Sequence, residues 1–344
     1  MAAACPRDEA DLEARLADPR PETVAALARC PGDLLVLGAG GKMGPTLARM
    51  ALAAAHRADG GHPRRVIAVS RFSSLRSERA LREAGVHTIR CDLLDRAAVA
   101  ALPDAANVIF MAGQKFGTHD APSRTWMMNV VVPAICAERF AASRIVAFST
   151  GTVYPLTPVG YGGARETDAP APVGEYAWSC LGRERVFEHA VAAGARVALM
   201  RLNYAIDLRY GVLTDLARRI LHGDPVSLDM GLVNVIWQGD ANRAALELLP
   251  HAGSPPFVLN VTGGEALSVR VLANELGRRL AREPRFVDTE APDALLSNTD
   301  RMAQTLAPPA MDLATMLDWV AEWVRAGRPL LDKPTHFDVR DGTF

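Results

Sequence analysis

Four glycines between positions 38 and 44 have the spacing needed to bind the phosphates of a nucleotide. They follow the apolar run Leu34–Leu37, and the residues from Pro45 onward take up helical spacing, so the pattern predicts a strand, a tight turn and a helix. Glycine allows unusual backbone dihedral angles and lets a pyrophosphate approach the helix N-terminus, where unpaired N–H groups favour an anion. The turn therefore predicts dinucleotide binding by Gly38, Gly40, Gly41, Lys42, Met43 and Gly44.

A Walker phosphate loop is the main alternative for this glycine turn. That motif requires glycine where Val36 stands and serine or threonine where Met43 stands, so we reject it. A purely structural turn can also be rich in glycine. The prediction of a dinucleotide site therefore depends on the segments that follow.

The end of the second predicted strand favours NADP over NAD. An acidic residue at this place would bind the adenosine ribose hydroxyls of NAD, but the sequence has Ser70 and Arg71. Arg71 can pair with a 2′-phosphate through charge-assisted hydrogen bonds, and Lys42 is a candidate second cation. The alternatives are that Arg71 is a solvated loop residue or stacks on the adenine of either cofactor. We therefore expect NADP as the favoured cofactor and NAD as the alternative.

Two further segments are expected to contact the cofactor. Asp92 and Leu93 directly follow the third predicted strand. Asp92 is placed to accept a hydrogen bond from the adenine amino group, although an N-cap for the next helix is an equal alternative. The small residues Ala112 and Gly113 stand at the end of the fourth predicted strand. They are expected at the carboxyl edge of the sheet, where a cofactor must pass close to the backbone.

Several motifs then occur in an order that resembles a known family. The chain resembles the extended short-chain dehydrogenases/reductases, in the branch of the NAD-dependent epimerases and dehydratases, from about Asp33 to the helix near 320. The residues that carry the resemblance are Gly38, Gly41 and Gly44 of the GxxGxxG turn, Asp92, Asn129, the segment Ser149–Tyr154, and Tyr176 of the YxxxK motif.

The resemblance implies hydride transfer between a nicotinamide cofactor and a hydroxyl or ketone of a sugar, sugar nucleotide or sugar acid. Tyr176 would be the general acid/base, and Thr150 would hydrogen-bond the same substrate oxygen. The residues expected at the cofactor are Ser149, Asn129, Tyr176, Cys180 and Asn203, and those expected at the substrate are Lys115, Thr150, Tyr210 and Trp237. Each of Lys115, Asn203, Tyr210 and Trp237 could equally pack the substrate lobe.

Cys180 stands where the family has lysine. Positions 176 and 180 share one face of a helix, where an ammonium would help the Tyr176 phenol to ionise near neutral pH. The positive nicotinamide ring and Arg183 are candidate substitutes, and an ordinary surface or ion-pair role is the alternative for Arg183. The missing lysine leaves open a second class of protein, an NADP-binding regulator or sensor without catalysis. Retention of both Thr150 and Tyr176 favours an enzyme.

The elements that must position these residues alternate along the chain. Alternating strands and helices predict an α/β fold with a doubly wound parallel Rossmann sheet and a smaller C-terminal substrate lobe. We expect a helical extension at 1–32, an NAD(P)-binding Rossmann domain at 33–202 and a mainly substrate-binding lobe at 203–344, from which segments near 233–261 could return to the Rossmann domain. The expected strands are 34–38, 65–70, 86–91, 107–112, 144–150, 195–201, 233–237 and 256–261, and the expected helices are 44–56, 75–84, 95–102, 124–141, 175–193, 212–222, 240–249, 268–282 and 312–326.

Composition restricts the cellular compartment and the classes of partner that we expect. The 344 residues are 49% hydrophobic with a net charge of -1, so we expect a substantial core and neither nucleic acid nor membrane as a partner. No stretch approaches the roughly 18 apolar residues of a membrane span, and the N-terminus turns acidic at Asp8 and Glu9. We therefore expect a cytoplasmic protein. The five cysteines are widely spaced without a CxxC pair, which predicts free thiols and no metal.

The resemblance also implies a homodimer. In the family, the helices expected near 124–141 and 175–193 pair across a two-fold axis as a four-helix bundle. An apolar stripe that faces the core of one subunit is the alternative. The apolar residues concerned are Met127, Val131, Ile135, Val186, Ala190 and Ala193.

Overall fold

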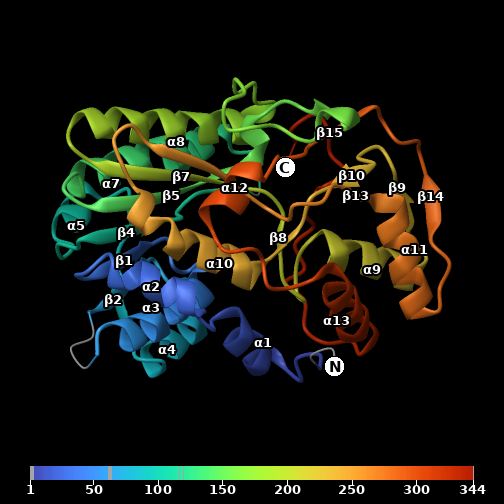
Figure 1. Cartoon of the computed structure of the whole chain (residues 1–344), viewed down its shortest axis with the longest axis horizontal. Helices are drawn as coiled ribbons and strands as arrows, with labels where there is room; N and C mark the ends of the chain where they lie inside the picture. The colour runs from blue at the N-terminus through green and yellow to red at the C-terminus, as the bar shows by residue number, and fades with distance from the viewer. Residues whose placement is uncertain (1–3, 61–63, 116, 119, 344) are drawn as a thin grey trace.

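A seven-stranded parallel sheet forms the centre of the computed structural model, which describes residues 4–60, 64–115, 117–118 and 120–343. The strand order is β12-β7-β5-β4-β1-β2-β3, and every pairing in this sheet is parallel. The predicted doubly wound Rossmann sheet is therefore confirmed (Figure 1). Its strands are β1 (Leu34–Leu37), β2 (Val66–Ser70), β3 (His87–Arg90), β4 (Asn107–Phe110), β5 (Arg144–Thr150), β7 (Arg196–Leu202) and β12 (Phe257–Val261).

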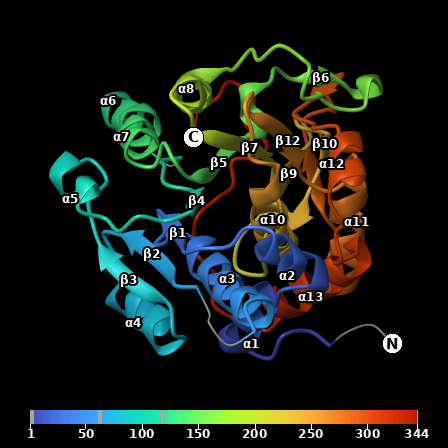
Figure 2. The same ribbon diagram turned by 60° about the vertical axis from the view of Figure 1, so that its left-hand side comes forward.

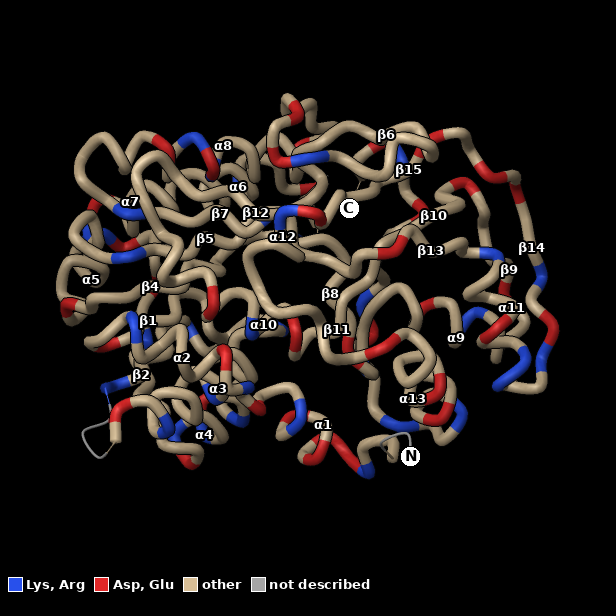
Figure 3. The backbone as a smooth tube through the Cα atoms, in the orientation of Figure 1, with Lys and Arg blue, Asp and Glu red and all other residues tan. Residues whose placement is uncertain are grey.

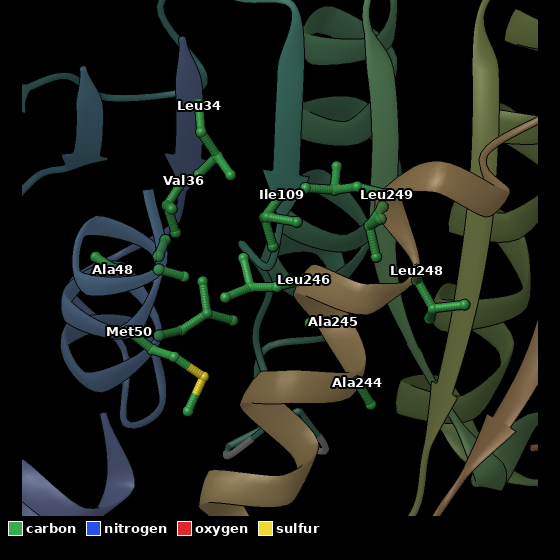
Figure 4. Packing of buried hydrophobic residues seen from close by; sticks show 14 of the residues in the cluster. Leu34, Val36, Ala48, Met50, Ile109, Ala244, Ala245, Leu246, Leu248 and Leu249 are labelled. Atoms are coloured by element: carbon green, nitrogen blue, oxygen red, sulfur yellow. The ribbon is translucent and has the colours of Figure 1, made fainter. Parts of the chain in front are cut away.

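Helices cover both faces of this sheet, and its inner strands are apolar on both sides (Figure 2). Leu34 and Val36 of β1 point to one face and pack with α3 and α10, as Figure 4 shows, while Leu35 and Leu37 point to the other face and pack with α7 and α8. The helices of the first face are α2 (Pro21–Ala28), α3 (Gly44–Ala58), α4 (Leu75–Glu83) and α10 (Gln238–Glu247), and those of the second are α5 (Arg96–Ala100), α7 (Val132–Arg139) and α8 (Gly174–Ala192).

The helix expected at 124–141 is interrupted. It consists of α6 (Pro122–Trp126), a π-helical turn at Met127–Val131 and α7. Pro133 explains the break because it has no N–H to donate to the preceding turn, and π-turns frequently occur at functional sites. The turn carries the buried Asn129.

A second apolar cluster forms the smaller lobe, around the helices α9 (Val212–His222), α11 (Val269–Leu280) and α13 (Leu313–Arg325). The strand expected at 233–237 is two short strands, β10 (Leu232–Val233) and β11 (Ile236–Trp237), which pair with β13 (Leu267–Ser268) and β8 (Ala205–Ile206). The sequence did not predict α12 (Asp300–Thr305) or the pairs of β6 (Thr157–Pro158) with β15 (Asp293–Ala294) and β9 (Pro225–Ser227) with β14 (Arg285–Val287).

The N-terminal segment connects the two clusters. Leu12 and Leu16 of α1 (Glu9–Leu16) are buried in the cluster of the smaller lobe, whereas Leu27 of α2 is buried against the sheet. The Glu13 carboxylate lies 3.1 Å from Arg49 of α3 and 3.3 Å from Arg209. This extension therefore contacts both parts of the molecule.

The last segment, from Gly327 to Thr343, has no regular structure but is well anchored. The Leu331 amide donates to the Arg209 carbonyl at 3.0 Å, the Thr335 hydroxyl donates to Asp215 at 2.6 Å, and the Phe337 side chain is fully buried. Gly342 lies against Gly174, where α8 begins. The tail therefore runs from α13 across the smaller lobe to the start of α8.

Charged side chains of both signs are mixed along the chain. In Figure 3, Lys/Arg and Asp/Glu segments alternate in both halves of the molecule rather than gathering by sign. In the described part of the chain, none of the helices has the length and apolar character that a bilayer crossing requires.

Candidate active site

The glycine turn lies at the point where the strand order reverses, between β1 and β4, which is where α/β sheets bind ligands. Gly38 has φ +91°, and a Cβ there would lie 2.5 Å from the Ala112 amide nitrogen; a Cβ on Gly44 would lie 2.4 Å from the Ala39 carbonyl oxygen. Both glycines are therefore required by close packing. A Cβ on Gly41 would meet only the Gly38 oxygen, at 3.6 Å, so this turn leaves open space in front of α3.

This open space fits a pyrophosphate. The α3 helix is 15 residues long, and its N-cap, Met43, provides no side-chain hydrogen bond. Its first N–H groups and the positive end of its dipole therefore suit an anion. The residues present thus fit the dinucleotide that the sequence predicts. Gly38, Gly40, Gly41, Lys42 and Met43 line a cavity at this turn.

The residues expected at the adenosine end lie outside that cavity. A Cβ on Gly40 would lie 2.5 Å from the Ser70 hydroxyl, so Ser70 closes over the turn. Arg71 is exposed, and among the described residues it has no hydrogen-bond or ion-pair partner. Asp92 is exposed and accepts a hydrogen bond from the Leu94 amide at 3.1 Å. The helix N-cap is Asp95, so the alternative role for Asp92 is wrong.

Asn129 positions the loop after β4. Its Oδ1 accepts from the Gln114 amide at 2.8 Å, and its Nδ2 donates to the Gln114 carbonyl at 2.9 Å. The asparagine therefore holds both backbone groups of Gln114 from the π-turn. Asn129 does not line the cavity, whereas Gly113 and Gln114 do. Ala112 is buried against Gly38, and Leu93 is buried in the core.

Tyr176 and Thr150 come together from different elements, as their expected roles require. Thr150 ends β5, Tyr176 lies in the first turn of α8, and their side chains share a hydrogen bond. Burial holds the pKa of the Tyr176 phenol well above its usual value, and the adjacent Cys180 thiol adds to this effect, while the charge of Arg183 and the bond to Thr150 lower the pKa. Burial also raises the pKa of Cys180. Tyr176 is therefore protonated at neutral pH in the free protein.

A cavity of about 570 Å³ connects the glycine turn with these hydroxyls. Twelve of the predicted site residues line it: Gly38, Gly40, Gly41, Lys42, Met43, Gly113, Lys115, Ser149, Thr150, Tyr176, Asn203 and Tyr210. The predicted residues that do not line it are Gly44, Ser70, Arg71, Asp92, Leu93, Ala112, Asn129, Cys180 and Trp237.

The predicted substrate residues differ in their placement. The Lys42 Nζ lies 4.0 Å from the centre of the Tyr210 ring and donates to the Ala205 carbonyl at 3.0 Å, so the glycine turn reaches the smaller lobe. Burial lowers the pKa of both Lys42 and Lys115 to about 8. Trp237 is buried, and its ring packs edge-on against Trp319 at 5.9 Å. We therefore correct its expected role, since it packs the lobe as an apolar side chain.

Sequence reasoning missed part of the cavity wall. Leu331, Lys333 and Thr335 of the C-terminal tail line the cavity, together with Thr152 and Gln114. The sequence of the tail has no helix or strand repeat of apolar residues that would have predicted its place at the cavity wall. Arg183, expected either as a substitute cation for Tyr176 or as an ordinary surface or ion-pair residue, also lines the cavity. None of the clusters of His, Cys, Asp or Glu among the described residues could hold a metal ion.

The fold and the site together define a class of protein. A doubly wound sheet with a glycine turn at its switch point, and a tyrosine and a threonine hydroxyl in the same cavity, is the arrangement of a nicotinamide-dinucleotide-dependent oxidoreductase. The sequence profile of the NAD dependent epimerase/dehydratase family matches residues 34–251. The chain belongs to this family, and it is an enzyme of the extended short-chain dehydrogenase/reductase type, as the resemblance implied.

Solved structures share this fold. MoeE5 in complex with UDP-glucose and NAD is 23% identical, with a TM-score of 0.69 over 86% of this chain and 99% of that chain. The UDP-Glc/GlcNAc 4-epimerase of Campylobacter jejuni is 19% identical, with a TM-score of 0.71 over 86% and 100%. The UDP-glucose 4-epimerase of Thermotoga maritima is 19% identical, with a TM-score of 0.70 over 86% and 99%. No curated protein matches the chain.

Proposed function

We propose that this enzyme prefers NADP and acts on a hydroxyl or ketone of a sugar, sugar nucleotide or sugar acid. The observation that carries the proposal is the meeting of Thr150 and Tyr176 in a cavity that begins at the phosphate-binding turn. Solved structures with this fold hold UDP-sugars and NAD, which supports the choice of substrate class.

Each hydroxyl has a distinct role in this proposal. Tyr176 exchanges a proton with the carbinol oxygen of the substrate, and Thr150 hydrogen-bonds the same oxygen and orients it. The glycine turn and Ser149 would hold the cofactor, and its nicotinamide would supply the hydride chemistry. If the hydride returns to the same substrate, the net reaction is epimerisation or dehydration; if it leaves with the cofactor, the reaction is a dehydrogenation or reduction.

The proposal is tested by offering the purified protein NADP or NAD with a panel of UDP-sugars, free sugars and sugar acids. Products are followed by chromatography and cofactor reduction by absorbance. We expect turnover of at least one of these compounds, and a rate at least about 100-fold lower for the Tyr176→Phe variant. Micromolar cofactor binding without turnover across the panel would contradict the proposal and favour the regulator or sensor.

Arg71→Ala is expected to reduce the binding free energy of NADP by about 1.5–3 kcal/mol and that of NAD much less. Only NADP offers a 2′-phosphate for a charge-assisted hydrogen bond. Titration calorimetry with both cofactors measures the difference. Arg79→Ala is the matched control, since Arg79 is an exposed arginine of α4 that pairs with Glu83. Equal losses for NADP and NAD in the Arg71 variant would refute the phosphate role.

We also propose a homodimer, on a face that keeps Met127 from the expected residues and adds two tryptophans. Ile135 and Ala190 are buried in the core of one subunit, and Val131 and Val186 pack against it. The exposed apolar side chains of these helices are instead Trp126, Met127 and Trp178, at 39%, 43% and 51% exposure. They come from adjacent elements, since α6 and the π-turn pack against α8, and together they are suited to cover a two-fold interface.

Trp178→Glu is expected to convert a dimer into single chains, because it places a charge in the apolar face. Light scattering at micromolar concentration measures the mass. Leu75→Glu is the control, since Leu75 is 67% exposed on α4, and it is expected to leave the dimer intact. A mass of one 36.9 kDa chain for the parent protein would refute the dimer.

The cytoplasm remains the proposed location. All five cysteines are free thiols in the structure, which is compatible with a reducing compartment.

A further inference from the structure

Arg183 differs from the other buried arginines of the described chain. Arg64, Arg201, Arg209 and Arg243 are each ion-paired with a carboxylate, in order Asp59, Glu184, Asp207 and Asp240. Arg183 is 6% exposed and, among the described residues, has no carboxylate within ion-pair distance.

The partners of Arg183 are all neutral. Its Nη1 donates to the Phe148 carbonyl at 2.9 Å and its Nη2 to the Asn129 Oδ1 at 2.7 Å, while its buried Nε has no hydrogen-bond partner. Removing a charge from water without a counter-charge is costly, and neutral acceptors compensate only part of that cost. A cation kept in this state is suited to stabilise a negative charge that forms only during the reaction.

The position of Arg183 identifies where that charge would form. Tyr176, Cys180 and Arg183 follow one another at spacings of four and three residues in α8, which places them on one face of the helix. Tyr176 and Arg183 both line the cavity. A Cβ on Gly113 would lie 2.4 Å from the Arg183 Nη2, so the glycine of the β4 loop leaves room for the guanidinium.

We propose that Arg183 stabilises the phenolate form of Tyr176 and so replaces the cation that position 180 lacks. This inference rests on the proposed function, because Tyr176 must be the acid/base. In the oxidative direction, the proton of the substrate hydroxyl passes to the phenolate oxygen of Tyr176, and Arg183 neither gains nor loses a proton. Asn129 is a positioning residue that fixes the guanidinium from the π-turn.

The groups that face the phenol determine its ionisation. They include Cys180 and Arg183 from α8 and Thr150 from β5. The Lys115 ammonium, from the loop after β4, lines the same cavity and acts on the Cys180 thiol. The charge that acts on the phenol from α8 is that of Arg183, and it lowers the pKa of Tyr176. Removal of this charge is therefore expected to raise the pH at which Tyr176 ionises.

The test is an ultraviolet titration of tyrosinate in the free protein, with the Tyr176→Phe curve subtracted to isolate residue 176. Arg183→Met is expected to raise the apparent pKa of Tyr176 by about one unit or more, a change of at least tenfold in the ionisation constant. Arg185→Met is the matched control. Arg185 lies two residues further on the same helix but is exposed and pairs with Glu188, so its loss is expected to leave the titration unchanged.

A rescue distinguishes the charge of Arg183 from its packing. Adding Cys180→Lys to Arg183→Met is expected to bring the titration back toward the parent curve, since residue 180 contacts Tyr176. If Arg183→Met does not fold, Cys180→Ala and Cys180→Lys in the parent are compared. Both remove a thiol that raises the pKa of Tyr176, and the lysine, which adds a positive charge, is expected to lower that pKa more than the alanine.

Superimposable curves for the parent and Arg183→Met, over a pH range in which the parent curve departs from that of Tyr176→Phe, would overturn the role of Arg183. So would superimposable curves for the two Cys180 variants. The titration needs no substrate, so failure of the proposed function shows instead as absence of turnover in the sugar panel.

Discussion

Tyr176→Phe is expected to lower kcat by about 10²–10⁴-fold with cofactor affinity nearly unchanged. The substitution keeps the ring and removes only the hydroxyl that exchanges a proton with the substrate. Steady-state assays on a substrate that the parent protein turns over measure kcat, and titration calorimetry measures the affinity for NADP. Because the hydroxyl acts in the transition state, the loss is expected in kcat more than in KM.

Tyr161→Phe provides the control for this experiment. Tyr161 is 49% exposed, and its hydroxyl donates to Asp168 at 3.1 Å, outside the residues that line the cavity. Its loss is expected to leave kcat within about twofold of the parent, as for a surface substitution. Parent-like turnover by the Tyr176 variant would remove Tyr176 from the catalytic role.

Glu184→Ala is expected to reduce the free energy of unfolding by about 3–5 kcal/mol, because it leaves a buried arginine without its counter-charge. The Arg201 Nε and Nη2 donate to the two Glu184 carboxylate oxygens at 2.9 and 2.7 Å, and both side chains are at most 5% exposed. Ser149 donates to the same carboxylate at 2.5 Å. The variant is therefore expected to disturb the cavity wall as well as the core.

Glu188→Ala is the matched comparison, one helical turn further along α8. Glu188 pairs with the exposed Arg185, so its loss is expected to cost no more than about 1 kcal/mol. Denaturant unfolding of the two variants gives both values. Equal losses would show that the Glu184–Arg201 pair contributes no more than a surface ion pair.

The sequence predicted the sheet well because its signals are local. The run Leu34–Leu37 is apolar without alternation, which indicates a strand buried on both faces, and the structure has β1 at these residues with both faces covered. The first predicted helix likewise corresponds to α3, at Gly44–Ala58. Strand and helix patterns of this kind can be recognised from neighbouring residues, without information on contacts between residues far apart in the sequence.

The remaining features depend on contacts between distant residues. Trp237 was expected at the substrate, but its partner Trp319 lies 82 positions later, which no local pattern reveals. Arg183 carries the same sequence signal as the ion-paired Arg201, and only the structure shows that one has a carboxylate and the other does not. The tail residues Lys333 and Thr335 line the cavity, and Thr335 is held by hydrogen bonds to Asp215, which lies 120 positions earlier in the chain.

The most direct test of the proposed role of Tyr176 is a crystal structure of the parent protein with NADP and a turned-over sugar, or with UDP-glucose as the first candidate. The account predicts that one carbinol or carbonyl oxygen of the sugar lies within about 2.6–3.2 Å of the Tyr176 hydroxyl. The same oxygen is expected to accept a hydrogen bond from Thr150. A bound sugar with all of its oxygens beyond hydrogen-bond reach of Tyr176, directly or through one water, would contradict it.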